Sequence, residues 1–477
     1  MHQTLRRTKI VATLGPATDS LDVLEALIAA GTDVVRLNFS HGHRDEQIMR
    51  AKKVREVASK LNRHVAILAD LQGPKIRIAQ FKDDKVWLKE GASFLIDVDM
   101  DTTCGDETQV ACIYKQLADD VSTGDRLLLD DGRIVLQVES HQGSKIFCKV
   151  IVGGELSNNK GVNLQGGGLS ANALTDKDKQ DIQSAAAMEV DYIAVSFPRD
   201  ADDMHYARSL VEAAGSHAHL IAKIERAEAM TVLEDIIDAS DAVMVARGDL
   251  GVEIGDANLP PAQKNIIRLA RERNTTVITA TQMMESMIQN PIPTRAEVFD
   301  VANAVTDGTD AVMLSAETSV GKYPVKTVQA MSKICEQAER QPSSIISKPR
   351  MGQQFERVDE AIALSTMYVA NHANIEVIAA FTVTGSTPLR MSRISSGIPI
   401  FAMVPDEKIC RRVSLYRGVS PVLIDLPSGT HEDVTKAAMS KLKQHHVVSE
   451  GDMIIVTTGE TVGDPGGTNT MKIVWVE

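Results

Sequence analysis

Lys223, Glu225 and Asp249 are the residues of this 477-residue sequence whose types and spacing are best suited to chemistry. Lys223 and Glu225 lie at the end of an apolar segment, residues 220–224, and Asp249 follows the next one, residues 242–246. Two carboxylates that converge from adjacent strands suit Mg²⁺, a hard cation that keeps several of its waters. A lysine beside them can stabilise negative charge on a transferring phosphoryl group. These residues therefore favour magnesium-assisted phosphoryl chemistry.

Other polar residues follow apolar segments in the same way. Arg36 and Arg77 could clamp phosphate oxygens, because the guanidinium group matches the geometry of a phosphate. Further polar side chains at predicted strand ends are those of Asn38, Ser40, Asp70, Lys75 and Thr281. Each charged residue among those named so far could, taken alone, belong to an ordinary ion pair at the rim of a fold. Their shared position at strand ends favours one active site instead.

The histidines, cysteines and glycine-rich stretches point to no second kind of site. His41 and His64 have no second histidine at ligand spacing on one helix, so we expect no histidine metal site. The five cysteines include no CxxC pair, which argues against structural zinc and against a disulfide framework. The stretches GGELSNNKG and LQGGGLS lack the GxxxxGK[ST] pattern of a P-loop, so they are interpreted as hinges and turns.

From residue 8 onward, apolar β-branched segments alternate with helix-like segments. Eight strands are predicted, at residues 9–13, 33–39, 64–71, 192–197, 220–224, 242–246, 276–280 and 311–314. Each is followed by a helical segment, residues 227–239 among them. Eight such units favour an α/β TIM (β/α)8 barrel over the alternative of two doubly wound sheets. In a TIM barrel the active site lies at the carboxyl ends of the strands, where the polar residues named above are found.

The alternation of strands and helices in the barrel is interrupted once. A second, shorter run of alternating strands and helices follows near the end of the sequence. Between residues 73 and 168, short strand-like pieces separated by Gly and Asp turns predict a small all-β domain inserted after the third strand. Residues 341–353 are rich in Pro, Ser and Gly and predict a linker. We therefore divide the chain into a barrel (1–71 and 169–342), an insert (72–168) and a C-terminal α/β domain (343–477).

Composition excludes several classes of protein. Lys and Arg number 51 and Asp and Glu number 64, a formal charge of −13, which disfavours nucleic-acid and anionic-membrane partners. No run of roughly 18 apolar residues could span a membrane, and the start of the chain lacks the apolar region of a secretory signal. With an odd number of cysteines, a reduced, cytoplasmic protein is expected.

Several longer motifs resemble those of one family. RRTKIVATLGPAT, DVVRLNFSHG, LADLQGPKIR, IAKIERAEA, ARGDLGVE and TATQMMESM are similar to stretches of bacterial pyruvate kinases, and the resemblance covers nearly the whole chain. It implies a TIM barrel, an inserted β-barrel lid and a C-terminal effector domain. The implied reaction transfers the phosphoryl group of phosphoenolpyruvate to ADP, giving ATP and, after protonation of the enolate, pyruvate.

The resemblance also implies roles for single residues. Glu225 and Asp249 resemble the ligands of Mg²⁺, for which Mn²⁺ could substitute, and Lys223 resembles the residue that stabilises the phosphoryl group. The backbone at Gly248 and the side chain of Thr281 resemble contacts to the substrate carboxylate. The remaining matches are Arg36 and Arg77 for phosphate, with Asn38, His41, Arg77 and Lys160 on the nucleotide side.

Potassium-dependent members of the family bind K⁺ through residues that match Asn38, Ser40, Asp70 and position 71, and carry a glutamate where this chain has Lys75. Here position 71 is leucine, which offers no side-chain oxygen, and Lys75 supplies a tethered positive charge. We therefore expect that K⁺ is not required.

In the C-terminal domain, TVTGST lies between a predicted strand and a helix expected to start near residue 389. Its hydroxyls and free N–H groups suit a phosphate, at Thr382, Thr384, Gly385, Ser386 and Thr387. Because the loop lacks the basic residue of fructose-bisphosphate-type members, we expect a sugar monophosphate or an AMP-type activator. A homotetramer is implied by the resemblance alone.

Two other functions are alternatives to the kinase. A Mg²⁺-dependent barrel lyase or aldolase acting on the enolate of a 2-oxo acid needs the carboxylates but no nucleotide-closing lid. A non-catalytic sensor of sugar phosphates would need neither Lys223 nor the carboxylates. The inserted domain and Lys160 favour the kinase over the lyase, and the intact Lys223, Glu225 and Asp249 set argues against the sensor.

Overall fold

In the computed structural model, the structure describes residues 5–341, 355–425, 430–459 and 466–477. The predicted linker at 341–353 and the predicted domain boundary after residue 342 lie outside the described residues, apart from Gln341. No helix within these ranges is both long and apolar enough to cross a membrane.

Eight parallel strands close into a barrel, which confirms the predicted TIM fold and excludes two doubly wound sheets. The order around the barrel is β1, β2, β3, β12, β13, β14, β15, β16, and β16 pairs with β1. Their bounds are β1 Lys9–Thr13, β2 Val34–Asn38, β3 Ala66–Asp70, β12 Tyr192–Val195, β13 His219–Ile224, β14 Ala242–Ala246, β15 Thr276–Ala280 and β16 Ala311–Leu314.

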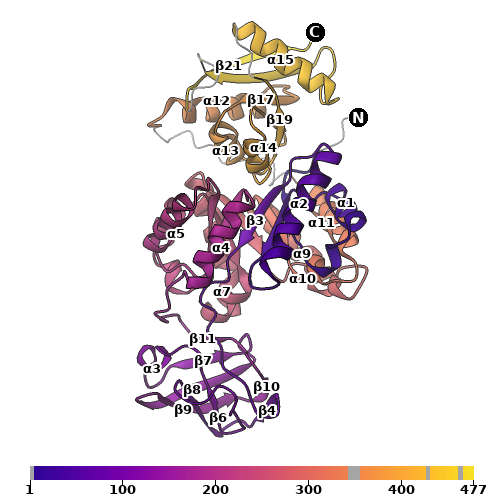
Figure 1. The fold of residues 1–477 in the computed structure, drawn as a ribbon. Coiled ribbons are helices and arrows are strands. Elements are labelled where there is room, and N and C mark those ends of the chain that lie inside the picture. Colours follow the sequence, from indigo (N-terminus) through magenta and orange to yellow (C-terminus); the bar gives the residue numbers. More distant parts are fainter. Residues whose placement is uncertain (1–4, 342–354, 426–429, 460–465) are drawn as a thin grey trace.

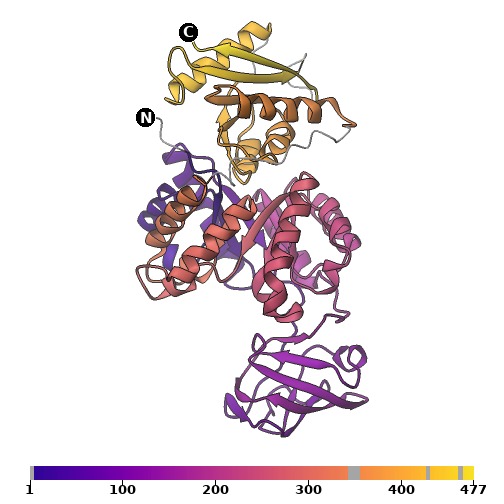
Figure 2. The ribbon, with the colours of Figure 1, turned by 180° about the vertical axis from the view of Figure 1, so that it is seen from behind.

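Helices surround the barrel (Figures 1 and 2). They are α1 Leu21–Ala29, α2 Arg44–Lys60, α4 Asp176–Ala187, α5 Ala201–Ala213, α6 Leu233–Asp238, α7 Arg247–Ile254, α8 Leu259–Glu272, α9 Arg295–Asp307, α10 Ala316–Ser319 and α11 Pro324–Ala338. Several start at a side-chain cap; for example, Thr294 Oγ1 accepts a hydrogen bond from Glu297 N–H at the start of α9.

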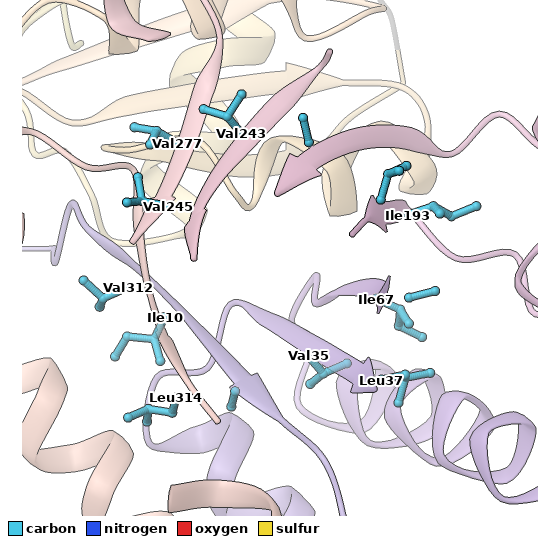
Figure 3. Close-up of a cluster of buried hydrophobic side chains, with 14 of the residues drawn as sticks. Ile10, Val35, Leu37, Ile67, Ile193, Val243, Val245, Val277, Val312 and Leu314 are labelled. Atoms are coloured by element: carbon cyan, nitrogen blue, oxygen red, sulfur yellow. The ribbon is translucent and has the colours of Figure 1, made fainter. Parts of the chain in front are cut away.

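The barrel strands are buried on both faces, which explains why they are nearly continuous apolar runs in the sequence. Residues on one face, such as Ile10, Val243 and Leu314, pack in the layer between strands and helices (Figure 3). Neighbours on the other face, such as Val11 and Met244, belong to a second buried cluster that continues into the C-terminal domain. This two-sided burial fixes the register and so the positions of the strand ends.

Between β3 and β12 the chain forms a β-rich body, here called the inserted domain. It has a six-stranded sheet in the order β11-β7-β8-β9-β5-β6, a two-stranded sheet β10-β4, and its own apolar core. Figure 1 shows it beyond one end of the barrel. Its elements are β4 Lys85–Leu88, β5 Ser93–Asp97, β6 Gln109–Ala111, α3 Leu117–Asp120, β7 Arg126–Leu129, β8 Ile134–Gln142, β9 Lys145–Val152, β10 Gly154–Ser157 and β11 Val162–Leu164.

The C-terminal domain lies against the opposite end of the barrel (Figure 1). Its five-stranded sheet has the order β19-β18-β17-β20-β21, in which only β21 is antiparallel to its neighbour. Its elements are α12 Val358–His372, β17 Val377–Phe381, α13 Ser386–Ser392, β18 Ile400–Val404, α14 Glu407–Val413, β19 Val419–Leu423, α15 His431–Gln444, β20 Met453–Gly459 and β21 Thr468–Trp475.

One predicted helix is wrong as a single element. The segment 227–239 contains a 3-10 turn, Glu228–Met230, and then the short α6. The N–H of Ala227 donates to Glu253 Oε2 (2.7 Å), and Val232 has a non-helical backbone (φ −119°). Tertiary contacts beside the site therefore override the local helical pattern.

Candidate active site

Lys223 is the centre of a group of side chains at the carboxyl ends of adjacent strands. Its Nζ lies 2.8 Å from Glu225 Oε1 and 3.4 Å from Asp70 Oδ1. It also donates to Ser196 Oγ, 2.8 Å away, which follows β12. Both carboxylates have side chains only 1% exposed. The barrel register thus brings together residues that are up to 155 positions apart (70 and 225).

Arg36, on β2, extends this group on the other side of Asp70. Its Nε donates to Asp70 Oδ2 at 2.6 Å, and its Nη1 donates to Thr13 Oγ1 at 3.1 Å. Asp70 is therefore held between two cations, Arg36 and Lys223. Arg36, Asp70, Lys223 and Glu225 form a continuous ion-paired cluster, which we call the Lys223 group.

Burial and neighbouring charges set the ionisation of the Lys223 group. Burial would lower the pKa of Lys223, but the Asp70 and Glu225 carboxylates outweigh it, so this pKa is raised and the ammonium stays charged. Burial would raise the pKa of Asp70, yet Arg36 and Lys223 hold it below its usual value. Burial, reinforced by Asp249 and Asp70 and opposed by Lys223, raises the pKa of Glu225 to about 7.

Asp249 supplies the second predicted metal-binding carboxylate. It lies in the first turn of α7, directly after β14, and its charge acts on Glu225. Asp249 also lines a solvent-open cavity between barrel and inserted domain, together with Lys75, Phe197, Arg226 and Asn163. Two neighbouring carboxylates fit Mg²⁺, which often takes one or two and completes its shell with water and substrate oxygens. Within the described residues no three His, Cys, Asp or Glu side chains form a fuller metal cluster.

Thr281 and Gly248 are brought together by a strained turn after β15. Thr281 has φ +66° and Gln282 φ +53°, a left-handed conformation that is unusual for a β-branched residue. The Gly248 N–H donates to Thr281 Oγ1 at 2.8 Å. Arg247 Nη2 donates to the Thr281 carbonyl at 2.6 Å, and its guanidinium also pairs with both carboxylate oxygens of Asp300 on α9. The Arg247–Asp300 pair therefore holds this turn in place.

Asn38, Ser40 and His41 lie at the end of β2 and in the turn that follows. Asn38 Oδ1 accepts from Ser40 N–H at 3.1 Å, and His41 is exposed. Gln47, buried in α2, donates through Nε2 to the carbonyl oxygens of Asn38 (3.1 Å) and His41 (2.9 Å). These two hydrogen bonds order the solvent-exposed loop that contains His41.

Arg77, Lys160 and Lys75 lie where the inserted domain joins the barrel. Arg77 pairs through its backbone with Gly161, next to Lys160. Lys160 Nζ lies 2.7 Å from Asp130 Oδ1, so it is ion-paired inside the inserted domain and not with the Lys223 group. Lys75 is exposed and lines the same cavity as Asp249.

The predicted effector residues lie far from this site, at the start of α13. Thr382 Oγ1 accepts from Gly385 N–H (2.9 Å), Thr384 Oγ1 donates to Ser386 Oγ (3.0 Å), and Thr387 Oγ1 lies 2.8 Å from Thr468 Oγ1. The helix starts at Ser386, earlier than the expected 389, because Gly385 in a left-handed conformation (φ +84°) ends the turn there. Ser386 and Thr387 are therefore in the first helical turn.

Sequence reasoning missed three residues that position the site: Ser196, Asp300 and Gln47. Ser196 had a usable signal, because it lies at the end of the fourth predicted strand, for which no polar end residue was considered. Asp300 and Gln47 are helical residues in amphipathic segments and give no such signal.

The geometry suits transfer of a phosphoryl group. A largely buried ammonium flanked by carboxylates at a barrel mouth can face developing negative charge. A nearby pair of carboxylates can hold a divalent cation. The N–H of Gly248 and the hydroxyl of Thr281 lie on the adjacent strand ends, where they can orient a substrate anion.

Comparisons with known proteins agree with one another. Residues 5–328 match the family model described as "Pyruvate kinase, barrel domain", and residues 360–474 match "Pyruvate kinase, alpha/beta domain". The chain is 56% identical over 485 residues to Pyruvate kinase II of Salmonella typhimurium, covering 100% of each chain. It is 55% identical over 463 residues to pyruvate kinase of Haemophilus influenzae, covering 96% and 97%. A crystal structure of a pyruvate kinase from Cryptosporidium parvum superimposes with TM-score 0.92 at 33% identity, over 99% of this chain and 96% of that one.

Proposed function

This chain belongs to the pyruvate kinase family, and we propose that the Lys223 group is the site where it transfers the phosphoryl group of phosphoenolpyruvate to ADP. The observation that carries this assignment is the placement of Lys223 between Asp70 and Glu225 at adjacent strand ends. In a water-poor site, one fixed cation aimed at a transferring phosphoryl group contributes strongly to the rate.

Each strand end contributes one part of the reaction. Arg36 binds the substrate phosphate, with its guanidinium fixed by Asp70. The Gly248 N–H and the Thr281 hydroxyl orient the substrate carboxylate. Glu225 and Asp249 would hold Mg²⁺ or Mn²⁺; when bound, the ion supplies Lewis-acid stabilisation of negative charge on the phosphate.

During transfer, the bond from the phosphorus to the enol oxygen breaks as a bond to the terminal phosphate oxygen of ADP forms. Lys223 faces the charge that develops on the transferring group. The enolate left behind takes a proton at its methylene carbon to give pyruvate. We assign Thr281, at the end of β15, as a relay for a proton from water; for this, its hydroxyl proton must leave the Ala280 carbonyl oxygen, to which Oγ1 donates (2.7 Å).

The nucleotide binds on the side of the inserted domain, through Asn38, His41, Arg77 and Lys160. Because Lys160 is paired with Asp130, the phosphates of ADP compete with that carboxylate for its ammonium. Movement of the inserted domain toward the barrel would exclude water, which otherwise accepts the phosphoryl group.

We further propose that the enzyme needs no K⁺. The side chain of Leu71 has no oxygen, and its carbonyl already accepts from Ser196 Oγ (2.7 Å). The Asp70 carboxylate is neutralised by Arg36 and Lys223, and Asn38 Oδ1 is occupied by Ser40 N–H. Lys75 supplies positive charge in the same cavity as Asp249, in place of a monovalent cation.

An activator of the sugar monophosphate or AMP type is proposed for Thr382, Thr384, Gly385, Ser386 and Thr387. The hydroxyl groups of this loop and the start of α13 suit one phosphate. A homotetramer in the cytoplasm completes the proposal. The cytoplasmic location is supported by the five cysteines, all of which are free.

A coupled assay for pyruvate with phosphoenolpyruvate and ADP tests the function. We expect turnover that requires both substrates and a divalent cation. Lys223→Met should lower kcat by about 10²–10³ or more, whereas Lys264→Met, which breaks an exposed pair with Asp307, should not. Pyruvate release without ADP consumption would favour the lyase alternative, and near-normal turnover of Lys223→Met would remove this residue from the mechanism.

A further inference from the structure

The inserted domain returns to the barrel through a stretch of chain that is held by a residue next to Glu225. We call residues 165–175, which lead from β11 to α4, the return connection (Figure 1). Arg226 directly follows Glu225 and is only 4% exposed. Its Nη1 donates to the carbonyl oxygen of Leu169 (2.8 Å), and its Nη2 donates to that of Ala171 (3.0 Å). One buried guanidinium group therefore ties the segment that carries Glu225 to the return connection.

Glu228 and Phe197 orient this guanidinium group. Glu228 Oε1 accepts a hydrogen bond from Arg226 Nη1 (3.2 Å), and the ring centre of Phe197 lies 5.9 Å from Arg226 Cζ. Gly167 of the return connection packs directly against the same carboxylate. Its φ is +82°, and an added Cβ atom would lie 2.0 Å from Glu228 Oε2. Because the guanidinium group is a planar fork, fixing its plane lets it bind both carbonyl oxygens at once.

Glu253 joins the return connection to the segment of the second predicted metal ligand. It lies on α7, one helical turn after Asp249. Its carbonyl oxygen accepts from Gly166 N–H (3.1 Å), and its Oε2 accepts from Ala227 N–H (2.7 Å). The segments that carry Glu225 and Asp249 are therefore both hydrogen-bonded to the same short stretch of chain.

On the basis that the Lys223 group transfers the phosphoryl group, we propose that Arg226 is a positioning residue, which holds the inserted domain where it shields that group from water. The return connection leads directly out of β11, a strand of the six-stranded sheet, so its contacts with Arg226 fix that sheet relative to the barrel. Leu169 and Ala171 are both buried, and buried carbonyl oxygens that lose their donors are costly. Without Arg226, the return connection therefore shifts to find other donors.

The shift has a chemical consequence, because water then reaches the phosphorus. The oxygen of a water molecule forms the new bond to phosphorus as the bond to the enol oxygen breaks. The water gives up a proton, and the enolate takes one at its methylene carbon. The products are inorganic phosphate and pyruvate, without ATP.

The products formed by Arg226→Gln test this proposal. Pyruvate, ATP and inorganic phosphate are measured after the full-length protein is mixed with phosphoenolpyruvate, ADP and Mg²⁺. The wild type should give equal amounts of pyruvate and ATP. The variant should give more pyruvate than ATP, with the difference recovered as inorganic phosphate. Its kcat/KM for ADP should fall by about 10- to 100-fold, because a displacement of about 1 Å can cause a loss of that size.

Arg208→Gln is the matched control. Arg208 Nη2 also donates to a carbonyl oxygen and to a carboxylate, those of Ala239 (3.3 Å) and Asp241 (2.9 Å). These contacts lie before β14, at the opposite end of the barrel from the Lys223 group. The control should form pyruvate and ATP in equal amounts, as the wild type does.

Glu228→Gln gives a second test that does not depend on the folding of Arg226→Gln. It keeps the shape of the side chain and removes the charge beside Arg226, so we expect the same excess of pyruvate over ATP, smaller in size. Equal amounts of pyruvate and ATP from Glu228→Gln, and from Arg226→Gln where it folds, would overturn the proposal and leave the proposed function intact. A wild type that forms no pyruvate would instead refute the proposed function, and the role of Arg226 with it.

Discussion

Asp300→Asn should impair catalysis although Asp300 lies on α9, outside the Lys223 group. Its carboxylate pairs with Arg247 at 2.6 and 2.8 Å. The same guanidinium donates to the carbonyls of Ala280 (3.2 Å) and Thr281 (2.6 Å). Removing the negative charge frees Arg247 to leave these carbonyls, and with them the turn that carries Thr281.

The size of the effect follows from two opposing energies. Loss of one partner from a buried charge pair costs about 3–5 kcal/mol, and we take about 2 kcal/mol because Asp300 is 33% exposed. The left-handed conformation of Thr281 stores about 1–3 kcal/mol of strain. The energy lost with the Arg247–Asp300 pair is thus comparable to the backbone strain of Thr281. The turn therefore relaxes in the variant, and the Gly248 N–H loses its hydrogen bond to Thr281 Oγ1. About 2 kcal/mol corresponds to a roughly 30-fold fall in kcat/KM for phosphoenolpyruvate.

Steady-state kinetics of Asp300→Asn, with phosphoenolpyruvate and ADP varied in turn, measure this fall in kcat/KM. We expect the loss in kcat/KM for phosphoenolpyruvate, with KM for ADP little changed. Asp307→Asn is the matched control, because it breaks an ion pair of the same helix with Lys264, away from the turn. Equal kinetics for the two variants, or a loss confined to ADP, would refute the reasoning.

Three further predictions concern ions, effectors and pH. Replacing K⁺ by tetramethylammonium at equal ionic strength should change the turnover of the wild type by less than about twofold. Lys75→Glu should lower activity and make the remaining activity respond to added K⁺. A many-fold loss of wild-type turnover without K⁺ would contradict the proposal that K⁺ is not needed. Glucose 6-phosphate, ribose 5-phosphate or AMP should activate the enzyme, and activation by fructose 1,6-bisphosphate alone would contradict the proposed site. Burial first, against the attraction of Asp241, lowers the pKa of His219 to about 4. Between pH 6.5 and 4 the unfolded chain therefore binds more protons than the folded one. As the pH is lowered through this range, the free energy of unfolding falls by up to about 3 kcal/mol. His219→Gln should flatten the decline in melting temperature, and an identical decline would rule His219 out.

The strands of the barrel were predictable because burial acts on both of their faces. Residues 242–246, 276–280 and 311–314 have the predicted bounds, and every one of their side chains is buried. The segment 227–239 was not predictable in the same way. Its helical pattern is present, but the contact of Ala227 with Glu253 depends on a residue in another unit of the barrel.

The same distinction applies to the site. Residues at strand ends could be predicted, since the barrel architecture alone brings strand ends together, and this places Lys223, Glu225 and Asp70 in contact. Their partners could not be predicted when they act from a helix. Asp300 reaches Arg247 from α9, and Gln47 reaches the Asn38 and His41 carbonyls from α2, at spacings that no periodicity encodes.

Strand β15 connects the C-terminal domain at one end of the barrel with the left-handed turn at Thr281 at the other end. Arg393 of the C-terminal domain forms a fully buried ion pair with Asp310, just before β16, and donates to the Thr275 carbonyl (2.8 Å), just before β15. At its other end β15 leads directly into Thr281. Five residues of strand span about 16 Å, and a strand buried on both faces moves as a rigid element because its core does not deform. A side chain of the C-terminal domain therefore holds the start of the strand whose other end carries the Thr281 turn.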